Sequence, residues 1–220
     1  MDIRALHREL IDLHGRPEKT YSEDGVRQLL TTILSQNVAD VQTARASENL
    51  FATYPDYRAM ESADREELAE VISDVGLMNQ KSRRIQRSLE RIREETGGED
   101  TLSFLDAMDT EAAQNWLTDI KGVGPKTASV VLNFHFEKPT FAVDTHIERV
   151  STRFGLIEES TTAAAAHEVL NETIPDDIKY SLHVLLIRHG REYCSAQDAD
   201  CSNPVCETYC DCAFSPPQPN

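Results

Sequence analysis

The sequence predicts an all-α protein, and two observations support this. Apolar residues recur at helical spacing along most of the chain, with residues 26–34 as the clearest i, i+3, i+4, i+7, i+8 pattern. The strict alternation of apolar and polar residues that marks half-buried strands is missing, and the apolar stretch at 139–143 is too short to indicate a sheet. With 220 residues and 40% hydrophobic side chains, the chain can bury a core without disulfides.

Nine or ten helices are expected in chain order. The apolar positions that repeat at helical spacing lie at 26–34, 85–92, 117–120, 128–132, 147–150 and 183–187. Residues typical of turns separate these segments, at 14–20, 76–81, 96–101, 121–126, 137–140 and 174–177. None of these connections is long enough to be a domain linker, and the Pro-rich tail at 214–220 is expected to be disordered.

The segment 121–131, Lys-Gly-Val-Gly-Pro-Lys-Thr-Ala-Ser-Val-Val, contains residue types that often contact phosphate. One interpretation is a nucleotide-binding P-loop, but that motif needs four residues between its first glycine and a Gly-Lys-Ser/Thr sequence. Pro125 also stands directly before Lys126 and removes an N–H that a phosphate cradle would use. The P-loop interpretation is therefore disfavoured.

The favoured interpretation of this segment is a helix, a tight hairpin and a second helix. Gly122 and Gly124 permit the turn, because glycine adopts positive φ without cost, and Pro125 suits the first helical position. The amides of Gly122, Val123 and Gly124 would then bind a nucleic-acid backbone phosphate without reading its sequence. An ordinary connection between two core helices is the alternative.

The hairpin and the later segment 141–150, Phe-Ala-Val-Asp-Thr-His-Ile-Glu-Arg-Val, together resemble the helix-hairpin-helix DNA glycosylases of the endonuclease III type. The resemblance covers roughly residues 22–212. It implies that Lys126, the lysine of a Gly-x-Gly-x-Lys segment, is the catalytic amine and that Asp144 is the second catalytic group. From the residues alone, a phosphate-contacting or solvated lysine and an N-capping aspartate are the simpler interpretations.

The chemistry of this family explains why a lysine and an aspartate are needed. A fixed carboxylate stabilises the positive charge that develops on the sugar as the N-glycosidic bond breaks. A neutral amine attacks the same carbon and forms a Schiff base, which allows β-elimination of the 3′ phosphate. Burial and the N-terminus of the second hairpin helix are both expected to favour the neutral form of Lys126.

The resemblance implies a base-excision repair enzyme whose partner is double-stranded DNA containing damaged bases or abasic sites. Lys126 favours a bifunctional DNA glycosylase and apurinic/apyrimidinic lyase, because family members that only remove a base usually lack that lysine. Oxidised pyrimidines are the substrates expected from the family. A monofunctional mismatch glycosylase and a non-catalytic DNA-binding module are the alternatives.

The resemblance also implies two α-helical lobes. One is a six-helix bundle at residues 20–133 that ends in the hairpin. The other joins residues 1–19 to residues 134–213 and carries a loop with an iron–sulfur cluster.

The strongest local run of positive charge lies at 81–93. Lys81, Arg83 and Arg84 are predicted to contact DNA phosphates from the exposed side of a helix whose apolar stripe is Ile85, Leu89 and Ile92. A solvated helix face paired with nearby glutamates is the alternative interpretation.

Two further DNA contacts follow from the resemblance. The segment 76–81 resembles the family's wedge loop, which implies that Leu77 enters the duplex where the damaged nucleotide leaves it. The segment 33–40 resembles the one that fills the vacated space, which assigns that role to Gln36. An exposed loop leucine and a helix-terminal glutamine are the corresponding alternatives.

All five cysteines lie between Cys194 and Cys212, and this close spacing favours a metal or cluster site over disulfides. The resemblance implies a 4Fe–4S cluster bound by Cys194, Cys201, Cys206 and Cys212, with Cys210 as an alternative ligand. The second spacing departs from the family pattern, because four residues rather than two separate Cys201 from Cys206. Zinc bound by four thiolates is the alternative cofactor.

The chain is strongly acidic, with 38 Asp and Glu against 22 Lys and Arg and a net charge of -16. Scarce lysine and excess acid suit a halophilic protein of an acidic proteome, and an ordinary acidic cytosolic protein is the alternative. A nucleic-acid partner must then be bound through a local patch. No apolar segment is long enough to span a bilayer or to act as a signal peptide, so a cytoplasmic protein without a membrane partner is expected. A monomer associated with the nucleoid is expected as well.

Overall fold

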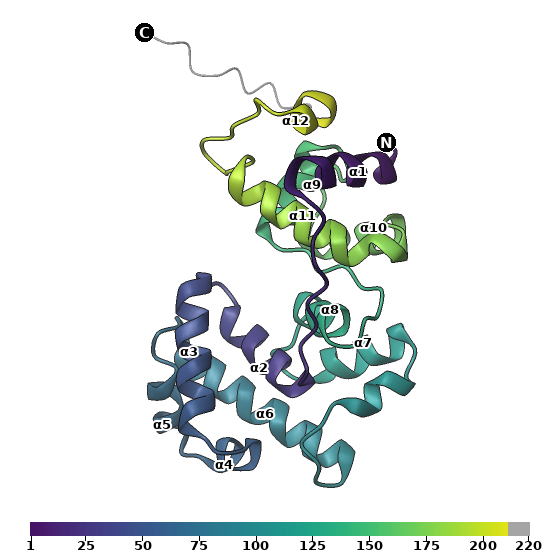
Figure 1. Ribbon diagram of the computed structural model, residues 1–220. Coiled ribbons are helices and arrows are strands. Elements are labelled where there is room, and N and C mark those ends of the chain that lie inside the picture. The colour runs from purple at the N-terminus through teal and green to yellow at the C-terminus, as the bar shows by residue number, and fades with distance from the viewer. Residues whose placement is uncertain (211–220) are drawn as a thin grey trace. The chain divides into compact units, whose positions relative to one another are not determined.

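The computed structural model describes residues 1–210 of the chain. Within this range the protein consists of twelve α-helices and two 3₁₀ helices, without a strand (Figure 1). The all-α prediction is confirmed. The tail at 214–220 and the predicted ligand Cys212 lie outside the described residues.

The chain divides into two compact units. The first, here called the cysteine unit, combines Met1–Thr20 with Pro139–Asn220, and the second, the hairpin unit, is Tyr21–Lys138. The helices of the hairpin unit are α2 (Gly25–Ser35), α3 (Asp40–Thr53), α4 (Tyr57–Ser62), α5 (Arg65–Val71), α6 (Met78–Thr96), η1 (Ser103–Ala107), α7 (Thr110–Asp119) and α8 (Pro125–Phe134). Those of the cysteine unit are α1 (Ile3–His14), α9 (Thr145–Arg153), α10 (Ala163–Thr173), η2 (Asp176–Ile178), α11 (Lys179–Glu192) and α12 (Pro204–Tyr209).

The helices that exceed the expected nine or ten are short. α4, α5 and α12 have only six or seven residues each. Two turns or fewer contain too few apolar positions for a helical period to be recognised in the sequence. A capping side chain begins each of them instead, from Asp56, Asp64 and Asn203 respectively.

The core of the hairpin unit is built around α2, which packs against α3, α6 and α8. Asp24 starts α2 by accepting hydrogen bonds from the amides of Val26 and Arg27. Leu29, Leu30 and Ile33 are fully buried, and burial of each such side chain contributes about 1.5–3 kcal/mol. This packing fixes the C-terminal end of α2, where Gln36 follows.

The core of the cysteine unit is built around α11, which packs against α1 and α9. Leu182, Leu185 and Leu186 of α11 are fully buried, together with Leu6 and Leu10 of α1. α12 also packs against α1, so the N-terminal helix supports the cysteine-bearing end of the chain.

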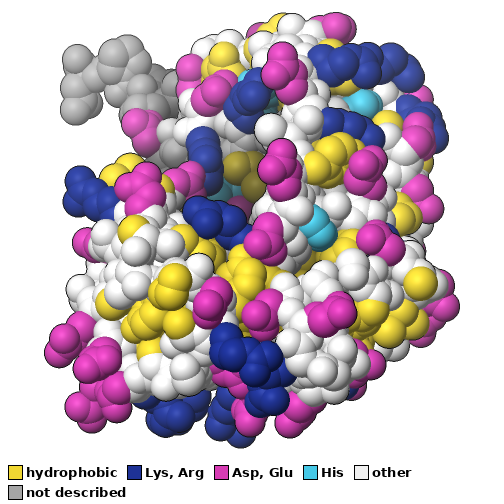
Figure 2. Space-filling view, turned by 60° about the horizontal axis from the view of Figure 1, so that its bottom comes forward, with side chains coloured by type: hydrophobic (Ala, Val, Ile, Leu, Met, Phe, Trp, Pro, Cys, Tyr) yellow, Lys and Arg dark blue, Asp and Glu magenta, His cyan; other side chains and the backbone are white. Residues whose placement is uncertain are grey.

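The surface is predominantly acidic. Figure 2 shows Asp and Glu side chains spread over the face in view, with Lys and Arg in several separate groups. A few large apolar side chains are exposed, among them Val41 and Leu77. None of the helices between residues 1 and 210 has the length and apolarity needed to cross a bilayer.

Candidate active site

The predicted hairpin lies between α7 and α8. Gly122 has φ +106°, a conformation that favours glycine, whereas Gly124 has φ −99° and is the N-cap of α8. Only the first of the two glycines is therefore required by backbone geometry. Pro125 is the first residue of α8, as predicted.

The amides of the hairpin are not equivalent. Val123 donates its N–H to the carbonyl oxygen of Ile120 at 2.9 Å, and its side chain is buried in the core. The expectation that Val123 offers its amide to phosphate is therefore wrong. The amides of Gly122 and Gly124 donate no hydrogen bond within residues 1–210, and no side chain caps the first turn of α8. These two amides and the first turn of α8 therefore leave backbone N–H donors without a partner among the described residues, which is what an anion-binding turn requires.

Lys126 is the second residue of α8, in the first turn, as predicted. Its side chain is exposed, so the expected burial of this amine is not found within the hairpin unit. The next residue, Thr127, is buried.

Lys81 differs from its prediction. Its side chain is 1% exposed, and Nζ donates to the carbonyl oxygens of Leu34 at 2.7 Å and Gln36 at 2.8 Å. Burial, with a smaller effect of the nearby Arg84 charge, lowers the pKa of Lys81 to about 8. The expected phosphate contact from the exposed face of α6 is therefore wrong, because the ammonium group points into the protein.

Gln36, Arg84 and Thr127 form a connected group within the hairpin unit. Arg84 Nη1 donates to Gln36 Oε1 in a short hydrogen bond, and Gln36 Nε2 donates to Thr127 Oγ1 at 3.0 Å. Arg84 is half-buried, whereas the Arg83 side chain is exposed and makes no hydrogen bond or ion pair among the described residues. Of the three predicted phosphate contacts, only Arg83 has the exposure assumed for it.

Leu77 is the N-cap of α6 and adopts the left-handed conformation, with φ +59°. This conformation costs a leucine about 1–2 kcal/mol, and the side chain is 55% exposed. An exposed apolar residue in a strained conformation is a typical feature of a functional position. The geometry is compatible with the predicted wedge role.

Asp144 is the N-cap of α9. Its Oδ1 accepts the N–H of Ile147 at 2.7 Å, which confirms the capping interpretation. The preceding segment is fixed by Asn171 of α10, which accepts the N–H of Phe141 at 2.7 Å and donates to the carbonyl oxygen of Phe141 at 2.9 Å. The carboxylate thus accepts one backbone hydrogen bond, and the segment that leads to it is anchored to α10. Asp144 belongs to the cysteine unit and Lys126 to the hairpin unit.

The four described cysteines are free thiols on the chain that leaves α11 and continues through α12. Hydrogen-bond donors point at two of the sulfurs: Arg153 Nη1 lies 3.1 Å from Cys194 Sγ, and Asn203 Nδ2 lies 3.3 Å from Cys206 Sγ. Such donors stabilise thiolates and tune iron–sulfur clusters. Within residues 1–210, no three His, Cys, Asp or Glu side chains converge as the ligands of one metal ion do.

A buried histidine adjoins the same cysteines. His189 Nε2 lies 3.4 Å from Cys206 Sγ, and His189 Nδ1 lies 3.2 Å from His14 Nε2. Burial, with a contribution from His14, lowers the pKa of His189 to about 4, so the ring is neutral at pH 7. Burial also raises the pKa of the Cys206 thiol to about 12, although the hydrogen bond from Asn203 acts in the opposite direction.

Arginines and an asparagine that the sequence interpretation missed hold the cysteine loop. Arg149 donates to the carbonyl oxygens of Cys194 at 2.8 Å and Gly190 at 3.0 Å, and Arg153 donates to that of Ser195 at 2.7 Å. Asn203 stands directly before Pro204, a sequence signal for an N-cap followed by the first residue of a helix. No comparable signal marks the two arginines, because their partners are distant in the sequence.

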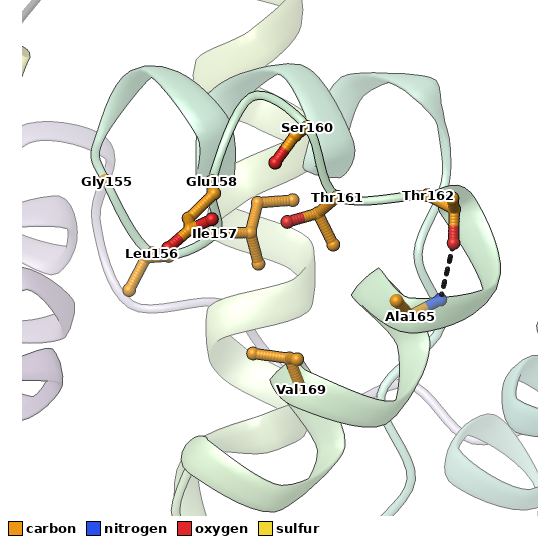
Figure 3. A pocket seen from close by; sticks show the side chains of 9 residues that line it. All are labelled: Gly155, Leu156, Ile157, Glu158, Ser160, Thr161, Thr162, Ala165 and Val169. Atoms are coloured by element: carbon orange, nitrogen blue, oxygen red, sulfur yellow. Dashed lines mark hydrogen bonds between the residues drawn. The ribbon is translucent and has the colours of Figure 1, made fainter.

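A pocket of about 650 Å³ lies between the loop 155–162 and α10 in the cysteine unit (Figure 3). Thr162 caps α10 at the edge of this pocket by accepting the N–H of Ala165 at 3.3 Å. The lining residues include neither Asp144 nor a cysteine. The predicted site residues are thus carried by helix ends and loops and not by this pocket.

Comparison with known proteins shows relatives along most of the chain. Residues 30–176 match the HhH-GPD superfamily of base excision DNA repair proteins. Endonuclease III of Thermotoga maritima is 33% identical over 205 residues, which is 93% of this chain and 88% of that protein. Endonuclease III of Rickettsia conorii is 34% identical, covering 85% of this chain and 84% of the relative.

Solved structures agree with these sequence relatives. An endonuclease III solved as a non-covalent complex with DNA superposes with a TM-score of 0.81 at 27% identity, covering 95% of this chain and 94% of that chain. An endonuclease III solved as a trapped covalent intermediate with DNA gives the same values. The fold, the hairpin and the extent of these matches together show that this chain belongs to the HhH-GPD superfamily of base excision DNA repair proteins, among its endonuclease III-like DNA glycosylases.

Proposed function

We propose that this protein is a bifunctional DNA glycosylase and apurinic/apyrimidinic lyase that acts on damaged double-stranded DNA. The observation that carries the proposal is the position of Lys126, an exposed amine in the first turn of a helix that follows a hairpin with two backbone amides unpaired among residues 1–210. A phosphate held by the amides of Gly122 and Gly124 would bring a DNA strand to the same turn. A similar protein, an endonuclease III, has been solved as a trapped covalent intermediate with DNA.

In the proposed reaction, the amine of Lys126 attacks C1′ of the damaged nucleotide as the N-glycosidic bond breaks and the base departs. The carboxylate of Asp144 stabilises the positive charge that develops on the sugar. The bond between C1′ and the ring oxygen O4′ of the resulting adduct then breaks, with O4′ taking up a proton, which gives an open-chain Schiff base; loss of a C2′ proton next breaks the bond between C3′ and the 3′ phosphate oxygen. Hydrolysis of the Schiff base releases the free enzyme.

Three further residues are proposed to contact the DNA directly. Leu77 is proposed to enter the duplex beside the damaged nucleotide, and Gln36 to fill the space that the nucleotide leaves. Arg83 is proposed to contact a backbone phosphate, since its guanidinium is exposed. Extrusion costs a few kcal/mol, and these contacts offset part of it.

The cysteine unit is proposed to bind a 4Fe–4S cluster, with zinc as the competing cofactor. Cys194, Cys201 and Cys206 would hold it together with Cys212 or Cys210. The donors at Cys194 and Cys206 fit thiolate ligands, which such a cluster requires. When bound, the cluster would cross-link the loop and thereby stabilise the C-terminal end of the unit. Purified protein should be brown, with broad visible absorption that acid bleaches, whereas a colourless protein with stoichiometric zinc would contradict the proposal.

The catalytic assignment is tested by borohydride trapping on DNA that contains a damaged base. Wild-type protein should give a covalent adduct, and Lys126→Ala should lose it while DNA binding is retained. Efficient trapping of the alanine variant would refute the role of Lys126. Base release without strand cleavage by the wild type would indicate a monofunctional glycosylase, and binding without base release would indicate a non-catalytic module.

Two substitutions separate capping from catalysis at Asp144. Asp144→Asn keeps an oxygen that can accept the N–H of Ile147, whereas Asp144→Ala loses the cap and about 1 kcal/mol of stability. If the carboxylate is catalytic, both variants should lose base release, although only the alanine variant is destabilised. Full activity of Asp144→Asn would restrict this residue to capping.

The proposal also specifies the substrates of the enzyme and the conditions under which it works. Oxidised pyrimidines are the proposed substrates, and a monomer working at the nucleoid in a salt-rich cytoplasm is the proposed state. A panel of duplexes with different lesions, assayed at low and high salt, tests the lesion preference and the salt requirement together. Preference for a lesion other than an oxidised pyrimidine would contradict the proposed substrate class. Inactivity at high salt would contradict the proposed salt-rich cytoplasm.

A further inference from the structure

We infer that Lys81, Arg84 and Thr127 form a cradle that holds Gln36 in position to fill the space left by an extruded nucleotide. Arg84 is then a positioning residue and not a phosphate contact. The inference rests on the proposed function, since it explains how the filling side chain is kept ready before DNA binds. It is built from contacts within the hairpin unit alone.

Lys81 fixes the main chain of Gln36. The last carbonyl groups of a helix have no partner within it, and Lys81 Nζ donates to two oxygens at the C-terminal end of α2, on Leu34 in its last turn and on the C-cap Gln36. A positive charge is also favourable at a helix C-terminus. The backbone that carries Gln36 is therefore tied to α6 by a buried side chain.

Arg84 and Thr127 fix the side chain of Gln36. The amide oxygen accepts from Arg84 and the amide nitrogen donates to Thr127, so both ends of the amide are engaged and its orientation is set. Thr127 is 4% exposed and cannot swing away without disturbing α8. The glutamine thus connects the end of α2 with α6 and with the helix that contains Lys126.

Arg84 is itself held against the hairpin. A Cβ built on Gly122 would lie 2.6 Å from Arg84 Cγ and 2.8 Å from Arg84 Cδ, so the arginine stem occupies the space beside this glycine. With its stem packed and its Nη1 hydrogen-bonded to Gln36, Arg84 has little freedom to follow a DNA backbone. The neighbouring Arg83 lacks these contacts and serves as a matched comparison.

The first experiment is a double-substitution cycle on single-turnover base release from a duplex with a paired lesion. Arg84→Met and Gln36→Ala should each slow base release about tenfold, and the double variant should be no slower than Gln36→Ala, because both remove the same interaction. Arg83→Met should instead combine multiplicatively with Gln36→Ala. Multiplicative behaviour of Arg84→Met would overturn the inference.

Salt dependence separates positioning from phosphate binding. If Arg83 contacts a phosphate, Arg83→Met should reduce the slope of log K against log salt by about one unit. Arg84→Met should leave this slope unchanged. A slope reduced as much by Arg84→Met as by Arg83→Met would show that Arg84 is a phosphate contact.

Thr127 provides a test that separates hydrogen bonding from packing. Thr127→Ser keeps the hydroxyl and loses a methyl group, whereas Thr127→Val keeps the volume and loses the hydroxyl. The serine variant should retain rapid base release from the paired duplex, and the valine variant should lose about as much as Gln36→Ala. Both variants should act normally on the same lesion in single-stranded DNA, where no space needs filling. The reverse order of the two variants would indicate packing only and would refute the cradle.

Failure of the proposed function can be distinguished from failure of the cradle. A wild-type protein that releases no base from any duplex refutes the function. The cradle is then decided by affinity for a duplex with an abasic site, where the same cycle applies. Coupling between Arg84 and Gln36 in that affinity supports the cradle, and independent effects overturn it.

Discussion

Substitution of Gly122 by alanine perturbs the hairpin at one defined atom. Gly122 has φ +106°, and holding a residue with a Cβ in such a sparsely populated conformation costs about 1–3 kcal/mol. The new Cβ would also lie 2.6 Å from Arg84 Cγ, so the arginine must move and release Gln36. Loss of a hydrogen bond from a charged donor costs about 1.5–3 kcal/mol. Because Arg84 is only half-buried, we expect a total loss of about 3 kcal/mol.

The loss is measured by urea unfolding, with Gly124→Ala as the matched control in the same hairpin. Gly124 has a negative φ, and nothing lies within 4 Å of a Cβ built on it, so its substitution should change stability by less than about 0.5 kcal/mol. In an Arg84→Ala background, the clash is absent and only the conformational cost of Gly122→Ala should remain. An equal cost of Gly122→Ala in both backgrounds would refute the argument that Arg84 packs against this glycine.

Two further predictions concern stability in each unit. The pKa of Lys81 is about 8 in the folded protein against 10.5 ordinarily, so between these pH values the unfolded chain binds the extra proton and the unfolding free energy should rise with pH, by about 1–3 kcal/mol. Urea unfolding from pH 7 to 10.5 measures this rise, which should vanish in Lys81→Met; an identical pH profile of the variant would contradict the assignment. Asn171→Asp should cost about 2 kcal/mol, because the carboxylate cannot donate to the carbonyl oxygens of Phe141 and His167. The exposed Asn79→Asp is the control, and equal thermal stability of the two variants would show that the Asn171 contacts contribute nothing.

The features that the sequence predicted correctly are those decided by neighbours along the chain. Gly122 and Pro125 determine where a helix can end and the next begin, and Asp144 caps the helix that follows it directly. The position of Lys126 in the first turn of a helix follows from the same local signals. Short-range geometry of this kind requires no knowledge of the rest of the fold.

The burial of Lys81 could have been anticipated in part. The apolar stripe of Ile85, Leu89 and Ile92, extended back by one turn, reaches Lys81, so the lysine lies on the buried face of α6. A run of basic residues suggested an exposed position instead. The carbonyl groups of Leu34 and Gln36, which make that burial tolerable, lie more than forty residues earlier and became visible only in the tertiary structure.

The amino-acid sequence by itself determined the helical class, the hairpin and the family, because periodicity, turn residues and motif spacing are local properties. Only the tertiary structure decided that Val123 is a core residue, that Arg84 holds Gln36, and that Arg153 points at the sulfur of Cys194. Each of these depends on a partner brought close by packing of distant helices. A polar side chain takes whichever partner the fold places within hydrogen-bond distance, since leaving a buried donor or acceptor unpaired costs more than almost any arrangement that satisfies it.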